Sequence, residues 1–136
     1  MRISAKGKYA LRMLVDLAEN GSEEYVSLSE ISQRQNISKK FLEQIVPMLV
    51  KNGIISANRG NHGGYKMRMA ADRCFVGEVL RATEGELIIL DPADNEADRK
   101  IAFVFEGMQN TLKQYADNIS IQDIVNHQSD SYDYYI

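Results

Sequence analysis

A group of polar and basic side chains in the middle of the chain has the chemistry to recognise a nucleic acid. The sequence ISKKFLEQ places Ser38, Lys39, Lys40, Glu43 and Gln44 close together. Lysine can neutralise phosphates, glutamate can accept a hydrogen bond from a cytosine amino group, and glutamine can pair with adenine. A good bidentate base contact contributes about 1–3 kcal/mol of discrimination between bases. These residue types therefore indicate contacts to a DNA backbone and to base edges.

The same charges also fit a solvated helix face. Charged segments are more often ordinary surface than binding sites, and Glu43 beside two lysines is compatible with simple solvation of a helix. An acidic residue lowers the affinity of a helix that faces DNA. We therefore favour a base-reading role for Glu43.

Charge is divided unevenly along the chain. The net charge is −3, but residues 1–70 carry 11 Lys and Arg against 6 Asp and Glu, and residues 71–136 carry 5 against 13. The two halves therefore have net charges of +5 and −8. A basic first half fits a polyanion-binding face, and an acidic second half indicates a different role.

Composition argues against an enzyme, a disulfide-rich protein and a membrane protein. A chain of 136 residues with 44% hydrophobic and 26% charged residues can form one domain with a core. Its one cysteine, Cys74, cannot form an intrachain disulfide, and its two histidines, His62 and His127, have no neighbouring acid or cysteine cluster to complete a metal or catalytic site. No apolar run reaches the ~18 residues of a membrane helix, and the N-terminal sequence has no signal-peptide core. We therefore expect a cytoplasmic protein without membrane contacts.

Two short helices joined by a tight turn are predicted to carry the polar group. Ser27 and Glu30 form a capping-box pattern at the start of the first helix, and Asn36 tolerates the left-handed turn after it. Ser38 can cap the second helix, whose buried side is predicted to contain Phe41, Leu42, Ile45 and Leu49. Pro47 lies inside this helix, so we expect a kink there and base readout only from the first two turns.

A β-hairpin with a glycine-rich tip is predicted to follow. Residues 54–58 form one strand, and residues 65–69 alternate apolar and basic side chains as the return strand. The sequence RGNHGG between them lacks the Lys-Ser/Thr pair of a phosphate-binding loop and leads into a strand, so a hairpin tip is the better interpretation. Arg59 at its base is expected to enter an A·T-rich minor groove, and His62 at the tip is expected to contact a phosphate or nothing.

The second half of the chain is predicted to join two copies of the protein. Residues 95–116 form the longest predicted helix, and its apolar residues recur every three or four positions: Ile101, Val104, Phe105, Met108, Leu112 and Tyr115. Such a stripe can line a cofactor, but packing is the better interpretation, and a small chain has little core left to cover it. We therefore expect the same helix of a second chain to cover it.

These patterns predict a mainly α-helical fold with a small β-hairpin. Residues 1–70 are expected to form a winged helix-turn-helix DNA-binding domain that starts with a helix capped by Ser4. Residues 71–136 are expected to form a connecting helix, a regulatory loop, a long C-terminal dimerisation helix and a tail. A winged helix can also bind proteins, but the division of charge favours double-stranded DNA.

Residues at five places along the chain form a specific combination, although each group is weak alone. The groups are Ser4-x-Lys6-Gly7-Lys8-Tyr9-Ala10, Ile37-Ser38 with Phe41-Leu42-Glu43-Gln44, Lys51-Asn52-Gly53, Arg59-Gly60 with Gly63-Gly64-Tyr65, and Gly77-Glu78-Val79 with Glu84-Gly85. Over nearly the whole chain they resemble the IscR/NsrR/CymR (Rrf-type) family of bacterial winged-helix transcription regulators. The resemblance implies a homodimer, with Lys6, Lys8 and Tyr9 as phosphate contacts. A symmetric dimer should read an inverted repeat with half-sites one or two turns, ~34 Å each, apart.

The family divides by its sensor. The resemblance implies that cluster-binding members hold an iron–sulfur centre on three cysteines in the loop before the dimerisation helix. Residues 87–98 contain no cysteine, and Cys74 lies earlier, where a buried structural thiol is the better interpretation. We therefore expect no cofactor and no metal. The chain most resembles the cluster-free CymR branch, which represses genes of cysteine metabolism, and a regulator of another stress or metabolite response is the alternative.

The last residues indicate a candidate protein contact. In CymR-like systems the co-regulator is cysteine synthase, and the active site of that enzyme accepts a C-terminal isoleucine carboxylate. The resemblance therefore implies that Tyr135 and Ile136 bind in this pocket. A tail that packs on its own dimer, or that stays disordered, is an equally good interpretation.

Overall fold

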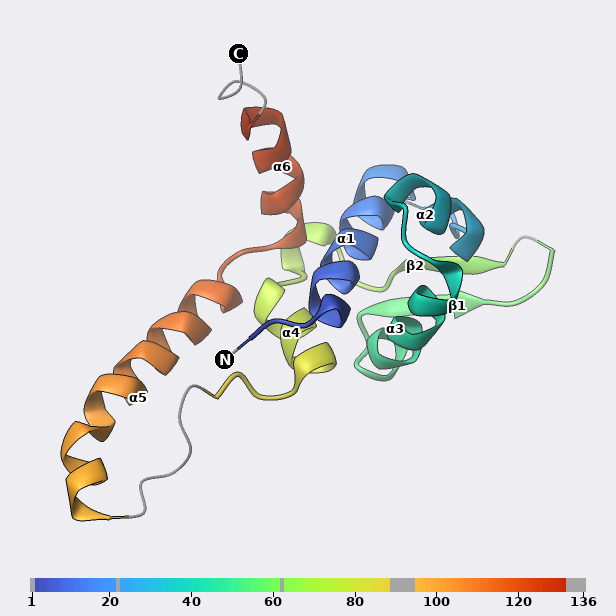
Figure 1. Ribbon diagram of the computed structural model, residues 1–136. Helices are drawn as coiled ribbons and strands as arrows, with labels where there is room; N and C mark the ends of the chain where they lie inside the picture. Colours follow the sequence, from blue (N-terminus) through green and yellow to red (C-terminus); the bar gives the residue numbers. More distant parts are fainter. Residues whose placement is uncertain (1, 22, 62, 89–94, 132–136) are drawn as a thin grey trace.

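Helices make up most of the structure, a computed structural model that describes residues 2–21, 23–61, 63–88 and 95–131. Figure 1 shows a body with the β-hairpin projecting on one side and the long helix α5 extending on the other. The predicted mainly α-helical fold with one hairpin is confirmed. In chain order, the elements are α1 (Ala5–Asn20), α2 (Leu28–Gln35), α3 (Lys39–Lys51), β1 (Ile55–Asn58), β2 (Gly64–Met67), the 3₁₀ helix η1 (Ala71–Arg73), α4 (Val76–Glu84), α5 (Glu96–Asp117) and α6 (Ile121–Ser131).

No described helix is long and apolar enough to span a bilayer.

The two short helices begin where their predicted caps lie. The Ser27 hydroxyl accepts a hydrogen bond from the Glu30 N–H at 3.2 Å, and the Ser38 hydroxyl accepts one from the Phe41 N–H at 3.1 Å. Asn36 ends α2 in the left-handed conformation, with φ 53° and ψ 48°. Pro47 is exposed and α3 continues through it. The kink expected there stays a prediction.

The hairpin is fixed to the start of α2 as well as to α3. Its register pairs Ile55 with Met67 and Asn58 with Gly64. Val26 and Tyr65 exchange two backbone hydrogen bonds of 2.8 Å, which add the segment before α2 to the edge of β2. A Cβ at position 64 would lie 2.3 Å from the Val26 carbonyl oxygen, so this close approach requires glycine.

One hydrophobic core joins the two halves of the sequence. α1 and α3 provide half of its buried residues, and Cys74, Val79 and Ile121 from the second half belong to the same cluster. α4 and α6 both contact α1. A capping box starts α6, since the Asp123 N–H donates to the Ser120 hydroxyl at 3.0 Å and the Ser120 N–H donates to the Asp123 carboxylate at 2.9 Å. The division of the chain at residue 70 therefore stays a prediction about roles, since residues on both sides share this core.

The long helix α5 contributes almost nothing to that core. Of its 22 residues only Ala116 is buried. Two residues of the predicted stripe, Phe105 and Leu112, are half-buried. Phe103, which the sequence pattern did not single out, is 73% exposed. The other four residues of the stripe are between 44% and 68% exposed: Ile101, Val104, Met108 and Tyr115.

Candidate nucleic-acid interface

The first two turns of α3 present the polar group to solvent. Ser38 at the N-cap and all four predicted residues inside the helix are exposed: Lys39, Lys40, Glu43 and Gln44. The opposite side of α3 carries four buried apolar residues: Leu42, Ile45, Val46 and Leu49. Because this side is packed in the core, the helix is held by its apolar face and offers its polar face to a ligand.

The N-terminal half of α1 lies beside the start of α3. The rings of Tyr9 and Phe41 pack edge to face, with centroids 5.0 Å apart and an interplanar angle of 77°. Lys8 is exposed and Lys6 is half-buried on the same half of α1. The structure thus places the half of α1 that carries the predicted phosphate contacts beside the start of α3, the helix that carries the predicted base-reading residues. Tyr9 as a whole is half-buried.

Arg12 was not among the predicted site residues, yet it connects α1 to the end of α2. Its guanidinium lies 5.2 Å from the centroid of the Tyr9 ring and donates to both the side-chain and backbone oxygens of Gln35. Gln35 in turn donates to the fully buried Asp16 at 3.2 Å, and Arg34 donates to the same carboxylate at 2.8 and 3.0 Å. The hydrogen bonds to Asp16 raise the pKa of Arg34. In the sequence, the one indication of the contact between Arg12 and Tyr9 was that the two residues are three positions apart and therefore lie on one helix face.

Arg59 is exposed immediately after β1, at the base of the hairpin tip. The tip is closed by a hydrogen bond of 3.0 Å from the Gly63 N–H to the Gly60 carbonyl. On the return strand, the Lys66 ammonium lies 4.7 Å from the centroid of the Tyr25 ring. His62, the other residue predicted at the tip, lies outside the described residues.

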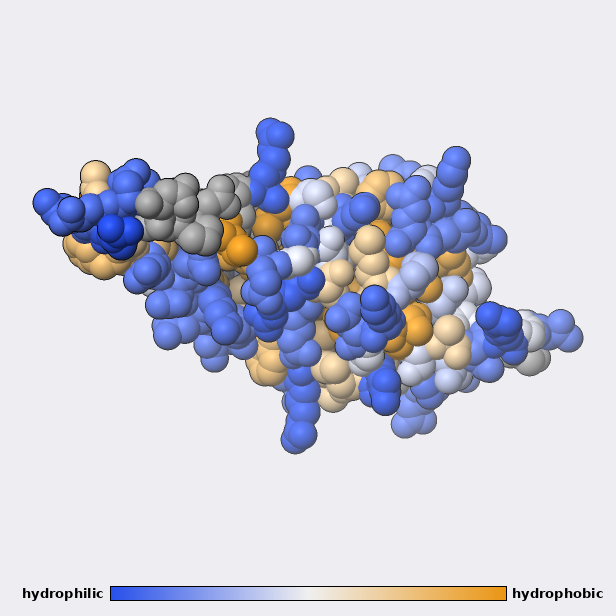
Figure 2. Space-filling view, turned by 90° about the horizontal axis from the view of Figure 1, so that it is seen from below, coloured by the Kyte–Doolittle hydropathy of each residue, from blue (hydrophilic) through white to orange (hydrophobic). Residues whose placement is uncertain are grey.

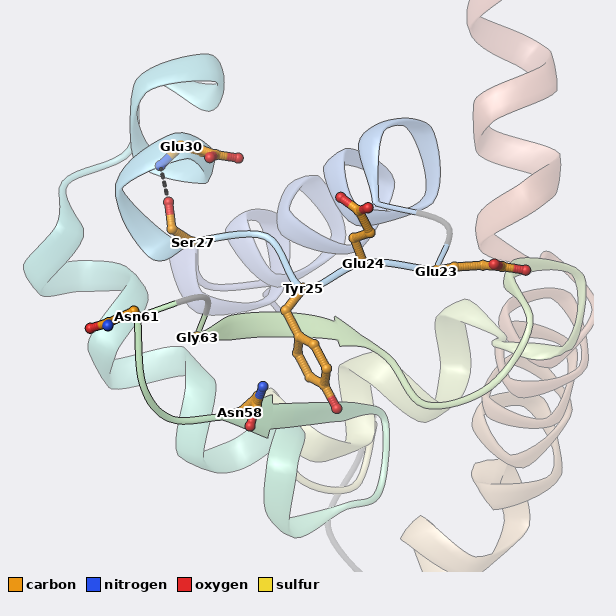
Figure 3. Close-up of a pocket in the computed structure, with 8 residues that line it drawn as sticks. All are labelled: Glu23, Glu24, Tyr25, Ser27, Glu30, Asn58, Asn61 and Gly63. Carbon is orange, nitrogen blue, oxygen red and sulfur yellow. Dashed lines mark hydrogen bonds between the residues drawn. The ribbon is translucent and has the colours of Figure 1, made fainter.

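One side of the hairpin is acidic. A recess there lies between the hairpin and the segment before α2, and Figure 3 shows that its side chains point in different directions and do not converge on one point. Glu23, Glu24 and Glu30 give it negative charge, which repels phosphates. The acidic lining therefore makes this recess unsuited to binding a phosphate group. The full lining consists of Glu23, Glu24, Tyr25, Ser27, Glu30, Asn58, Asn61 and Gly63.

The potential metal ligands in the described part of the chain lie apart from one another. Its His, Cys, Asp and Glu side chains form no group of three that could hold a metal ion. Cys74 is fully buried, and burial raises the pKa of its thiol to about 12. A thiol that stays protonated is a poor nucleophile and a poor metal ligand.

A capped helix, a left-handed turn, a second helix with an exposed polar face and a hairpin with an exposed arginine together define a winged helix-turn-helix protein that binds DNA. This class of protein acts through recognition and not through catalysis.

Comparison with known proteins gives the family. Residues 3–127 match the model of the Rrf2 family, described as "Iron-dependent Transcriptional regulator", and the chain belongs to this family of transcription regulators. It is 33% identical to the regulator IscR of Erwinia tasmaniensis over 94% of this chain and 81% of that protein. It is 29% identical to the regulator CymR of Bacillus subtilis over the full length of both. The solved structure of the B. subtilis CymR, called the global cysteine regulator of that organism, superposes with a TM-score of 0.82 and 28% identity, covering 93% of this chain and 98% of that one.

The description of the family names iron, but one chain cannot provide the three cysteines that the resemblance implies for a cluster. Its single cysteine is Cys74, which lies in the core at the start of the segment leading to α4. Residues 87–98 contain no cysteine, and those at 89–94 lie outside the described residues. The residues present therefore do not fit a three-cysteine iron–sulfur site.

Proposed function

We propose that two copies of this chain bind an inverted DNA repeat, each placing α3 in the major groove and Arg59 in a neighbouring minor groove. The observation that carries the proposal is the polar face of α3, fully exposed over a buried apolar side. Lys6, Lys8 and Tyr9 contact phosphates and set the register of α3. Glu43 and Gln44 read bases, while Ser38, Lys39 and Lys40 contact the backbone or base edges at the groove entrance. His62, which lies outside the described residues, is proposed to contact a phosphate or nothing.

The proposed dimer forms through α5. Figure 2 shows hydrophobic atoms at the surface on the α5 end of the molecule, on the left, among hydrophilic ones. A helix with one buried residue out of 22 and five large, exposed apolar side chains is unlike the other long helix, α1, whose apolar face is covered. The proposed interface comprises Ile101, Val104, Phe105, Met108, Leu112 and Tyr115. The same surface on two copies gives the two-fold symmetry that an inverted repeat requires.

Salt dependence and one base-specific variant test DNA binding. The affinity for duplex DNA should fall steeply between about 50 and 200 mM salt, because bound phosphates release counterions. Gln44→Ala should relax the preference at one base position in each half-site. Lys51→Ala is the matched control, since Lys51 is exposed at the far end of α3 and outside the proposed contacts. Weak DNA binding that changes little with salt would favour the alternative, a winged helix that binds proteins.

The proposed target genes belong to cysteine or sulfur metabolism, repressed without an iron–sulfur cluster. The full-length match to CymR and the superposition on its structure support this role, although IscR relatives are as similar in sequence. The chemistry of Cys74, the one cysteine, supports the absence of a cluster. Anaerobic incubation with ferrous iron and sulfide should produce no cluster absorption and no change in DNA affinity. Cluster absorption with altered DNA binding would overturn this part of the proposal and favour an IscR-like sensor.

The proposed contact with cysteine synthase concerns Tyr135 and Ile136, which lie outside the described residues. Its support is the family resemblance alone. Capture of purified cysteine synthase by the chain, compared with the chain lacking these two residues, tests it directly. Loss of capture on truncation supports the contact, whereas equal capture or none removes the tail from the proposal.

A further inference from the structure

A carboxylate from the end of α4 caps the first turn of α1. One oxygen of Glu84, Oε1, accepts three hydrogen bonds: from the Ser4 N–H at 3.0 Å, from the Ser4 hydroxyl at 2.6 Å and from the Gly7 N–H at 3.1 Å. Ser4 occupies the N-cap position that its sequence predicts, but its side chain makes no cap hydrogen bond of its own. Instead it donates to Glu84, which takes over the role of the cap.

The Glu84 carboxylate and Gly7 fit together closely. A Cβ at Gly7 would lie 2.6 Å from Glu84 Oε1 and 3.1 Å from Leu80 Cδ2, so a side chain at position 7 would displace the carboxylate. A negative charge at a helix N-terminus also interacts favourably with the helix dipole and with the unpaired N–H groups there. The end of α4 therefore holds the start of α1 through hydrogen bonds, charge and shape.

The held turn is the one that carries the proposed phosphate contacts. Lys6 lies inside the capped turn and Lys8 directly follows it. We infer that Glu84 is a positioning residue for DNA binding, which fixes the first turn of α1 so that Lys6 and Lys8 meet the phosphate backbone. This inference rests on the proposed phosphate contacts of the two lysines. Glu84 would also link the two halves of the chain, because α4, the helix that it ends, contacts both α1 and α5.

Removing Glu84 should change the DNA affinity in the direction opposite to the one that net charge alone predicts. Removing an acidic residue raises the net charge of the protein and should strengthen its binding to a polyanion. If Glu84 positions the lysines, its removal should weaken DNA binding instead. Glu86 is a matched control, since it has the same charge, is exposed and lies two residues further along, beyond the end of α4.

The experiment compares Glu84→Ala, Glu84→Gln, Glu86→Ala and the double variant Lys6→Ala/Lys8→Ala in the full chain. Binding to duplex DNA is measured by fluorescence anisotropy over a range of salt concentrations. Glu84→Ala should weaken binding about tenfold and lower the salt slope by roughly 1 for each lysine that no longer meets a phosphate. Glu84→Gln, which keeps one carbonyl acceptor, should restore part of the affinity. Glu86→Ala should bind as well as or better than the original chain.

Combining the substitutions distinguishes a failure of the positioning role of Glu84 from a failure of the phosphate contacts of Lys6 and Lys8. In the background of Lys6→Ala/Lys8→Ala, adding Glu84→Ala should cause no further loss of affinity, because the side chains that it positions are gone. Amide hydrogen exchange should show faster exchange at residues 5–8 in Glu84→Ala and unchanged exchange in α3. If the lysine variant itself keeps the original salt slope, the phosphate contacts fail. If the lysine variant has a lower slope but Glu84→Ala does not, or if the two reductions in affinity simply add, the positioning role of Glu84 fails.

Discussion

The two long helices of this protein, α1 and α5, have similar apolar patterns and opposite environments. Of the 16 residues of α1, seven are buried, and they pack against α2, α3, α4 and α6. Of the 22 residues of α5, one is buried. The apolar face of α1 is covered within its own chain, whereas most large apolar side chains of α5 are exposed on a helix that extends away from the body (Figure 1). The first region therefore forms a core within its own chain, whereas the exposed apolar side chains of the second fit the proposed contact with a partner chain.

The largest effect should come from a charge placed in the open face of α5. Met108→Glu should convert the dimer to monomers, because burying a carboxylate in an apolar helix interface costs several kcal/mol. DNA affinity should then fall by about 100-fold or more, since the two half-sites are no longer bound together. Analytical ultracentrifugation and anisotropy with an inverted-repeat duplex measure both changes.

Phe103→Glu is the matched control for that variant. Phe103 is more exposed than Met108 and belongs to the same helix, but it lies outside the proposed interface. The variant should remain dimeric. Monomers in Phe103→Glu, or dimers in Met108→Glu, would place the dimer contact elsewhere.

The next largest effect should come from a cavity in the covered face of α1. Leu14 is fully buried, and Leu14→Ala should lower the free energy of unfolding by about 2–5 kcal/mol. Val104→Ala, made in the monomeric Met108→Glu background, should change it by less than about 0.5 kcal/mol, because shortening an exposed side chain leaves no cavity. Urea denaturation of the four proteins checks the contrast. Similar destabilisation in both variants would show that α5 packs on its own chain.

A smaller effect is expected for the hairpin arginine. Arg59→Ala should weaken binding to sites with A·T base pairs flanking the major-groove contact by about tenfold and should leave sites with G·C flanks less affected, because a narrow A·T minor groove attracts arginine. Competition between the two duplexes measures the ratio. Arg68→Ala, at an exposed residue just after β2, serves as the control. Equal weakening on the two duplexes would assign Arg59 a plain phosphate contact.

The smallest effect concerns Cys74, whose buried thiol contrasts with the reactive cysteine of a sensor. Its pKa is raised from 9.0 to about 12, so the native protein should react with iodoacetamide at pH 8 only after unfolding. The unfolded thiol ionises first, so the unfolded state binds fewer protons above pH 9 and the stability should fall as the pH rises towards 12. Mass spectrometry of alkylated native and unfolded protein checks the first point. Rapid alkylation of the folded protein would show that the thiol is accessible.

Features that depend on neighbouring residues could be predicted from the sequence. The caps at Ser27 and Ser38 and the left-handed turn at Asn36 each involve groups within a few positions of each other, and their chemistry determines where the helices start and stop. The alternation of apolar and basic side chains over residues 65–69, after a glycine-rich tip, likewise predicted the hairpin. The polar face of α3 followed from the helix period once these ends were known.

Contacts between distant residues could not be predicted in this way. Ser4 and Glu84 are 80 positions apart, and only the packing of α4 against α1 brings them together. The helix period predicted an apolar stripe on α5, but which stripe residues face solvent depends on how α5 is oriented against the body. Phe105 and Leu112 are half-buried for this reason, while Met108, which lies between them in the sequence, is exposed.

The most direct test of a symmetric DNA-reading dimer is a selection of binding sites from a random duplex library, made with the full chain and with Gln44→Ala. The original chain should enrich an inverted repeat with half-sites about one or two helical turns apart. Gln44→Ala should enrich the same repeat with the preference removed at one symmetric position in each half. Enrichment of single, unpaired sites, or identical sequences from both proteins, would contradict the assignment of α3 as the base-reading helix of a homodimer.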